Sequence, residues 1–382
     1  MKYDFNKISH RFHTSSVKWD VLDNELPMWV ADMDFLVLDD IKKAIKDAAD
    51  MGSYGYTYPT EEFFKAYQLW WKKRHNLSLD IKDMVYCSGV VSALDSLINH
   101  TTNKGDAIML LTPVYSGFFS VINNNQRHLV TSDLIIKDDE YFINYQDVEN
   151  KIKKEKVKAI IFCNPQNPIG KIWSKEEISK LYGITKKYDV MFISDEIHCD
   201  IVAPYHQYVP ALSVSDDIIT CLAPSKVFNL AGLQSAVIVI KNEELRKLAQ
   251  ESFYHDDVGE PNYFAIPATI AAYEKGDQYV DEMNAYIEEN KRYVYDYLDK
   301  NIPEIKAFKQ DATYLMWLNI AKLNIKSKEF VELLRKQTGL YIFEGTHYGE
   351  VGEYFIRMNV ATSLDNVKDA MSRLKTFIEK RR

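Results

Sequence analysis

Short apolar runs alternate with polar, helix-like segments through the middle of this 382-residue chain. Because these runs are apolar at nearly every position, both faces of each strand are expected to be buried. That pattern predicts an α/β fold with three layers, αβα, in which helices cover a mainly parallel sheet on both sides. The strands expected are Met84–Cys87, Ala107–Leu111, Lys158–Cys163, Val190–Ser194, Thr220–Ala223 and Ser235–Ile240.

The character of the chain changes near residue 284. Helical patterns separate the earlier strands, whereas a long helix over Tyr279–Leu298 precedes two further strands and two further helices. We therefore expect a large domain over residues 40–283. A smaller α+β domain would combine residues 284–382 with residues 1–39, the irregular N-terminal segment folding back onto it. The later elements expected are Thr313–Ile320, Ser327–Thr338, Glu353–Asn359 and Leu364–Lys380.

Charge and apolar run length exclude several classes of partner. The formal net charge is −8, from 47 basic and 55 acidic residues, and no long basic run overrides it. We therefore expect no nucleic-acid partner and no anionic membrane surface. The longest apolar runs are strand-sized, whereas a membrane helix needs about 20 apolar residues. The N-terminus has no apolar signal core, so the chain is expected to be cytoplasmic.

The cysteines predict neither disulfides nor a metal site. The chain has only four, and no two of them form a C-x-x-C pair. His198, Cys199 and Asp200 are consecutive, so their side chains could not all face one metal if they extended a strand. No metal is expected.

Four loops follow predicted strands, at the sheet edge where ligands bind in such folds. Gly89 opens a helix at Val90 and Val91, where backbone N–H groups can meet an anion. Asn167 lies in a doubled Asn-Pro turn. The remaining two loops carry charge and are Ser194–Asp200 and Ala223–Gly232.

The charged residues of these loops carry the chemistry. Asp195 ends an apolar strand and needs a cationic or donating partner there, and His198 could point toward the same site. Lys226 follows Ser225, and a lysine in an apolar pocket becomes a nucleophile. Taken singly, each feature has an ordinary alternative: a plain turn, a structural histidine or a surface lysine.

Together, these motifs resemble the fold-type I pyridoxal-phosphate (PLP) enzymes of the class I/II aminotransferase superfamily, over nearly the whole chain. The resemblance implies that Lys226 binds PLP covalently and that Asp195 pairs with the pyridine nitrogen. For the cofactor ring, it implies that Asn167 binds the phenolic oxygen, that Tyr115 stacks on the ring and that His198 lies nearby. For the phosphate, it implies binding by Gly89, Val90, Val91 and Ser225, and by Tyr56 of a second subunit. For the substrate, it implies that Arg357 binds the carboxylate beside Tyr115 and Asn167. A homodimer with shared active sites is therefore expected.

Two departures resemble the MalY/PatB-type cystathionine β-lyases. His198 stands where the aminotransferases usually have tyrosine, and Gln234 stands where they often have a phosphate-binding arginine. Without that arginine, backbone N–H groups, Ser225 and Tyr56 are expected to hold the phosphate. The subgroup implies α,β-elimination on L-cystathionine or a related sulfur amino acid, with Lys226 as the base and Lys226 or Tyr56 as the acid for the leaving sulfur.

Two alternatives to the carbon–sulfur lyase remain. An aminotransferase would use the same lysine, aspartate, asparagine and arginine, and only the shape of the site separates the two reactions. The second alternative belongs to another class of protein: a regulator with the PLP fold that binds a partner. No partner surface is evident in the sequence, and the complete catalytic set favours an enzyme.

Overall fold

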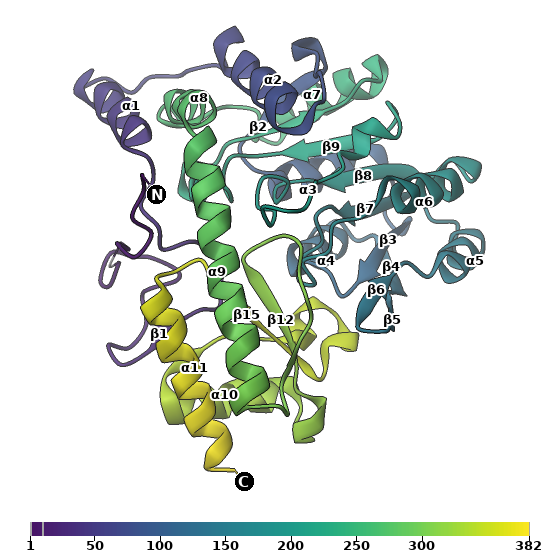
Figure 1. The fold of residues 1–382 in the computed structure, drawn as a ribbon. Coiled ribbons are helices and arrows are strands. Elements are labelled where there is room, and N and C mark those ends of the chain that lie inside the picture. The colour runs from purple at the N-terminus through teal and green to yellow at the C-terminus, as the bar shows by residue number, and fades with distance from the viewer. Residues whose placement is uncertain (1, 10, 382) are drawn as a thin grey trace.

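The computed structural model describes residues 2–9 and 11–381 and contains two separate larger sheets (Figure 1). The larger one has seven strands in the order β2-β10-β9-β8-β7-β3-β4. β10 alone runs in the opposite direction to the other six strands, so the sheet is mainly parallel as predicted. The strands are β2 (Met84–Cys87), β3 (Ala107–Thr112), β4 (His128–Asp133), β7 (Ala159–Cys163), β8 (Met191–Asp195), β9 (Ile219–Leu222) and β10 (Ala236–Val239).

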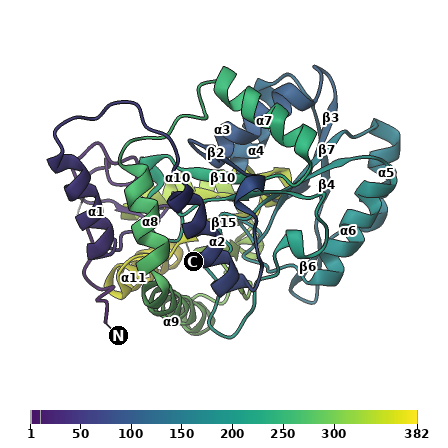
Figure 2. The same cartoon turned by 90° about the horizontal axis from the view of Figure 1, so that it is seen from above.

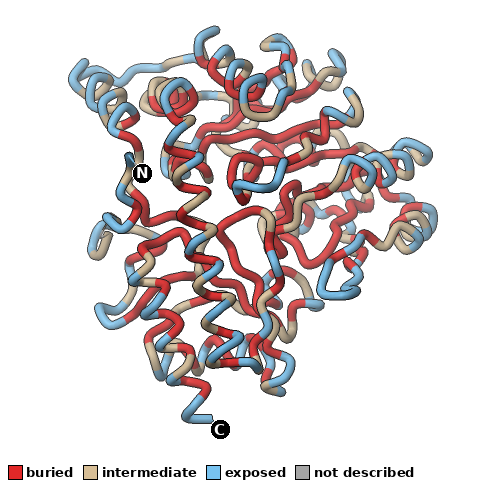
Figure 3. The backbone as a smooth tube through the Cα atoms, viewed as in Figure 1, coloured by how far each residue is buried: buried red, intermediate tan, exposed pale blue. Residues whose placement is uncertain are grey.

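Both faces of this sheet are covered by helices. In β3, Ile108 and Leu110 pack into the core formed with α3 (Val90–Thr101), α4 (Ser116–Asn124) and α7 (Glu243–His255). The alternate residues Met109 and Leu111 pack on the opposite side, into the core formed with α5 (Tyr145–Glu155) and α6 (Lys175–Lys187). Figure 2 shows the two helix groups apart, and Figure 3 shows the strands between them as buried. The three predicted layers are present.

Several short or edge strands were not predicted from the sequence, and β4 is the longest of them. β4 lies at the edge of the sheet, paired only with β3. Its residues alternate between buried and exposed positions, with Val130 and Ser132 buried. An edge strand of this kind lacks the continuous apolar run by which the central strands were recognised. The two-stranded hairpin of β5 (Ile135–Lys137) and β6 (Glu140–Phe142) was missed for the same reason.

The smaller sheet has four antiparallel strands in the order β11-β12-β15-β14. These are β11 (Lys306–Ala307), β12 (Leu315–Asn319), β15 (Phe355–Asn359) and β14 (Phe343–Glu344). The helices that pack on it are α9 (Asp277–Asn301), α10 (Ser327–Thr338) and α11 (Leu364–Glu379). The division into domains at residues 39/40 and 283/284 stays a prediction, and α9 runs unbroken through the second boundary (Figure 1).

The N-terminal segment folds back onto the smaller sheet region, as expected. β1 (Leu26–Pro27) pairs in parallel with β13 (Leu340–Tyr341). Glu25 accepts two hydrogen bonds from Arg335, at 2.6 and 2.8 Å. The chain then continues into α1 (Asp39–Asp50) and an exposed link to α2 (Glu61–His75), which packs with α8 (Ala265–Lys275) near β2 and β10 (Figures 1 and 3).

No helix among residues 2–9 and 11–381 is long and apolar enough to span a membrane.

Asn290 ties α9 to the end of β15. Its side chain is completely buried, and its Nδ2 donates to the carbonyls of Val360 and Thr362, both at 2.9 Å. We expect Asn290→Ala to lower the free energy of unfolding by about 1–3 kcal/mol, because two buried carbonyls lose their donor. Urea denaturation measures this. Gln278→Ala is the control on the same helix, since its exposed Nε2 donates to Glu282 of that helix. An equal loss in both variants would show that the two Asn290 hydrogen bonds do not stabilise the fold.

Candidate active site

A cavity of about 220 Å³ lies at the carboxyl ends of the central parallel strands. Its wall is formed by the loops that follow β2, β3, β7, β8 and β9, because parallel strands end at one edge of a sheet. Most of the predicted site residues line it together: Gly89, Val90, Val91, Tyr115, Asn167, Asp195, His198, Ser225 and Lys226. Gln234 lines it as well. Arg357 and Tyr56 are outside this lining.

Lys226 lies at the centre of this group. Its Nζ donates to the backbone carbonyl of Ala31 at 2.9 Å. Burial lowers the pKa of this amine and the charge of Arg357 lowers it further, while Asp32 and Asp195 act in the opposite direction. The amine is therefore easier to deprotonate than that of an exposed lysine, as a nucleophile or base requires.

Asp195 is buried at the end of β8 with few partners of its own. Its Oδ1 accepts from the backbone N–H of Ile197 at 3.2 Å. Burial raises the pKa of this carboxyl to about 7, against the opposing effects of that N–H and of Lys226. A cation placed beside Asp195 would compensate for the buried negative charge.

His198 lies in the turn after Asp195, and its side chain is 2% exposed. Its Nδ1 is buried and has no hydrogen-bond partner within the described residues. Burial lowers the pKa of the imidazole to about 3, and the charges of Lys226 and Arg357 act in the same direction. His198 is therefore neutral near pH 7 and leaves a ring nitrogen unpaired in the wall of the cavity.

Arg357 reaches the site from β15 of the smaller sheet. Its NH1 donates to Oδ1 of Asn167 at 3.1 Å, and its NH2 donates to the Trp29 carbonyl at 2.8 Å. The Tyr348 ring lies 4.7 Å from the guanidinium carbon. A guanidinium has five N–H donors, so others remain for an anion. Burial lowers the pKa of Arg357, which makes an anionic partner favourable.

A helix N-terminus forms another wall of the cavity. α3 begins at Val90 directly after Gly89, and Ser225 lies beside the same space. First-turn N–H groups have no intrahelical partners, and the helix dipole adds positive potential there. The arrangement can bind a phosphate or another anion.

Sequence reasoning assigned no role to the strap, residues 29–33, which crosses the site. The carbonyls of Trp29 and Ala31 accept hydrogen bonds from Arg357 and Lys226, respectively. The Met33 N–H donates to Asn229 Oδ1 at 3.2 Å, and Asn229 Nδ2 donates to the Met33 carbonyl at 2.8 Å. Backbone acceptors carry no residue-type signal, so the sequence pattern could not indicate these contacts.

Tyr56 is placed differently from the other predicted residues. It lies in the link between α1 and α2, and 97% of its side chain is exposed. Tyr58 is 73% exposed in the same link. Tyr56 therefore contributes nothing to the cavity of its own chain.

Comparisons with known proteins agree with this geometry. The family model for class I and II aminotransferases matches residues 25–374. Cystathionine beta-lyase PatB of Bacillus subtilis is 36% identical over 98% of this chain and 100% of its own length. The structure of cystalysin from Treponema denticola, which contains pyridoxal 5'-phosphate, has a TM-score of 0.96 and 32% identity and covers 100% of both chains. The PLP-bound C-S lyase from Staphylococcus hominis has a TM-score of 0.92 and 33% identity over 98% of each chain.

The cavity suits PLP on its own chemistry. It offers an amine in Lys226, a buried carboxylate in Asp195, an unpaired ring nitrogen in His198 and an anion site at the start of α3. These match the aldehyde, pyridine nitrogen, ring face and phosphate of the cofactor. With a family match over most of its length and relatives above 30% identity, this chain belongs to the class I and II aminotransferase family of PLP-dependent enzymes.

Proposed function

We propose that this protein is a PLP-dependent carbon–sulfur β-lyase. It would cleave L-cystathionine or a related cysteine S-conjugate by α,β-elimination, with water, to a thiol, pyruvate and ammonia. The observation that carries the proposal is that Lys226 and Asp195 line one cavity, with Arg357 hydrogen-bonded to Asn167 of the same lining. The relatives of this chain include a cystathionine beta-lyase and a C-S lyase.

PLP, when bound, supplies an electron-accepting ring that stabilises negative charge at the substrate α-carbon. Lys226 would hold the cofactor, and its amine is the base for the α-proton. The lowered pKa of this amine favours that role, because a larger fraction is unprotonated near neutral pH. For the proton that the leaving sulfur needs, Lys226 and Tyr56 stay the two candidates.

Asp195 would keep a proton on the pyridine nitrogen. Its carboxyl has a pKa of about 7 because it is buried, so a neighbouring cationic ring would favour its ionised form. The Asp195 carboxylate would thereby favour the protonated, electron-accepting form of the ring, which is electrostatic stabilisation by a preorganised group. His198, neutral and unpaired at Nδ1, would line the cofactor ring without adding charge.

Arg357 and Asn167 would bind the α-carboxylate of the substrate. The planar guanidinium can bind a carboxylate through two parallel hydrogen bonds. Asn167 and the Trp29 carbonyl already hold NH1 and NH2, so the fork is oriented before substrate arrives. Tyr115, which lines the same cavity, would pack over the cofactor ring.

We further propose a homodimer in which Tyr56 completes the phosphate site of the partner chain. The exposed aromatic side chains of Tyr54, Tyr56 and Tyr58 in one link support this, because contiguous apolar surface favours a protein interface. Gln234 supplies no cation where an arginine often binds the phosphate in the family, so a further donor is needed. A cytoplasmic location is also proposed, since the four cysteines are free.

The reaction type is tested by product analysis with L-cystathionine. The holoenzyme is expected to release pyruvate and homocysteine in equal amounts, and Lys226→Ala is expected to lose about 10²–10⁴-fold in rate together with the absorbance of lysine-bound PLP. Lys180→Ala, a surface helix lysine, is the control. Amino transfer to a 2-oxo acid without pyruvate would instead indicate the aminotransferase.

Arg357→Lys tests the carboxylate site. Lysine keeps the charge but loses the planar fork, so kcat/KM for L-cystathionine should fall by roughly 10- to 150-fold, the equivalent of about 1.5–3 kcal/mol. Steady-state kinetics measure this, with Arg292→Lys at an exposed position of α9 as control. Unchanged kcat/KM would remove Arg357 from substrate binding.

Mixed dimers test the shared site. Lys226→Ala and Tyr56→Ala chains, each of low activity alone, are unfolded and refolded together with PLP. If Tyr56 serves the partner chain, half of the dimers carry one intact site, and about a quarter of wild-type activity returns. If Tyr56 serves its own chain, every site of the mixture is defective and no activity returns.

A further inference from the structure

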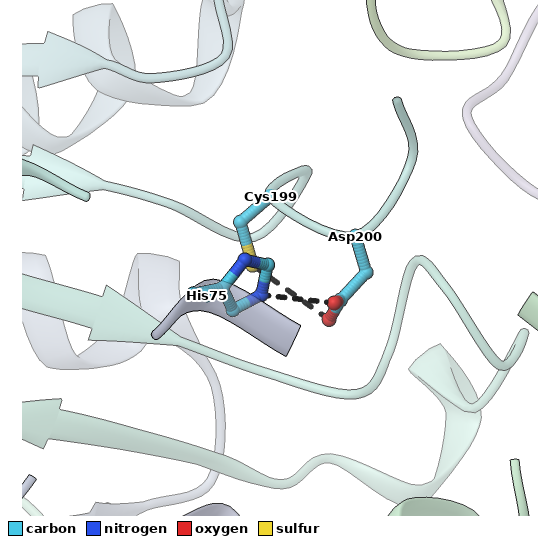
Figure 4. Close-up of side chains that lie close together, drawn as sticks. All are labelled: His75, Cys199 and Asp200. Carbon is cyan, nitrogen blue, oxygen red and sulfur yellow. Dashed lines mark hydrogen bonds and ion pairs between the residues drawn. The ribbon is translucent and has the colours of Figure 1, made fainter. Parts of the chain in front are cut away.

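A second cluster of chemically active side chains lies outside the catalytic cavity. It consists of His75, Cys199 and Asp200 (Figure 4). His75 Nε2 lies 3.0 Å from Asp200 Oδ1, and Cys199 Sγ lies 3.7 Å from Asp200 Oδ2. One nitrogen, one sulfur and one oxygen atom all lie within 4.8 Å of one another. None of the three residues lines the catalytic cavity.

The local backbone explains why neighbouring side chains meet here. In an extended strand, the side chains of Cys199 and Asp200 would point to opposite faces. β8 instead ends at Asp195, and the chain turns through residues 197–200. Both side chains therefore face the same side, toward the last residue of α2, which is His75.

The cluster is held in place by its surroundings. The indole Nε1 of Trp70 donates to both carboxylate oxygens of Asp200, at 3.1 and 3.0 Å. The Trp71 ring lies 4.6 Å from the His75 ring, centroid to centroid. Asn284 Nδ2 donates to the Asp200 backbone carbonyl at 2.8 Å. Such supporting contacts orient ligand side chains in metal sites.

Nearby positive charges are already neutralised. Lys73 pairs with Asp277 at 2.8 Å, and Arg74 pairs with Asp277 at 3.1 Å and with Asp281 at 2.6 Å. The carboxylate of Asp200 thus retains its attraction for a further cation. A thiolate at Cys199 together with Asp200 would balance a divalent charge.

The cluster opens onto a cavity of about 520 Å³. His75, Cys199 and Asp200 all contribute to its wall, with Tyr208 and Asn284 among the others. An ion can therefore enter, and water can occupy a fourth coordination position. Imidazole, thiolate and carboxylate are the donor types that zinc takes, and three protein ligands plus water is one of its usual sets.

We propose that His75, Cys199 and Asp200 form a binding site for a divalent cation of the zinc class, with water as the fourth ligand. Neutral His75 binds through Nε2, and the Cys199 thiol releases its proton to solvent as the thiolate–metal bond forms. The imidazole then exchanges its contact with Asp200 for the metal. The ion joins the end of α2 to the turn that carries His198.

The test uses the holoenzyme, freed of metal with a chelator and then dialysed against a small excess of Zn²⁺. One equivalent is expected to remain per chain, with a rise in melting temperature. Cys199→Ala and His75→Gln should each lose at least tenfold in zinc affinity and lose the rise. Cys221→Ala, another buried cysteine, is the matched control and should retain both.

Co²⁺ gives a readout that needs no substituted protein. A thiolate-bound tetrahedral Co²⁺ absorbs in the visible at longer wavelengths than the cofactor, and this spectrum is expected on addition of Co²⁺ to the metal-free holoenzyme. Absence of retained zinc and of this spectrum would overturn the proposal and leave a His75–Asp200 hydrogen bond only. Zinc binding that His255→Ala abolishes and Cys199→Ala spares would also overturn it, assigning the ion to the more exposed cluster of His100, His255 and Asp256.

Discussion

The burial of both faces of the seven-stranded sheet is the constraint on which the site depends. Side chains such as Ile108 and Met109 alternate between two apolar cores, so charged groups have no place within the central strands. They are accommodated only where the strands end. Asp195 is the last residue of β8. Its carboxyl is buried, and burial raises its pKa to about 7. A buried carboxyl of this kind costs free energy until a cation or donor lies beside it.

The strap, residues 29–33, couples the two sheets at this point. It begins beyond β1, which pairs with β13, and its carbonyls then accept from Arg357 and Lys226. One side chain comes from the smaller sheet and the other from a loop after the larger one. The strap therefore sets the position of Arg357 relative to Lys226, through backbone atoms that any residue type could supply.

The charges in the cavity separate the roles of its residues. Lys226 has a lowered pKa, Asp195 a raised one, and His198 is neutral. Pairs of groups whose surroundings shift their pKa values in opposite directions are typical of acid–base sites. The same groups would serve an aminotransferase. The assignment to β-elimination therefore rests on the relatives and on the two departures, His198 in place of tyrosine and Gln234 in place of a cation at the anion site.

Much of the site could be predicted from sequence because its residues follow apolar strands directly. The strand pattern, with the rule that parallel strands end at one edge, made Gly89, Asn167, Asp195 and Lys226 candidates, and the family resemblance supplied their roles. Arg357 needed the family resemblance, because nothing local in β15 marks it. The edge strand β4 was missed, since half of its residues face solvent and leave no continuous apolar run.

The sequence by itself determined the layers of the fold, the loops that carry chemistry and the family, because these follow from periodicity and from motifs of adjacent residues. Only the tertiary structure decided which distant groups meet. The contacts of Ala31 with Lys226, of Trp29 with Arg357, and of His75 with Asp200 join residues 195, 328 and 125 positions apart. Two of these contacts use backbone carbonyls, which every residue has. The third depends on the path of the loop after β8, which the strand pattern does not specify. Such contacts arise from packing, and local sequence carries no record of them.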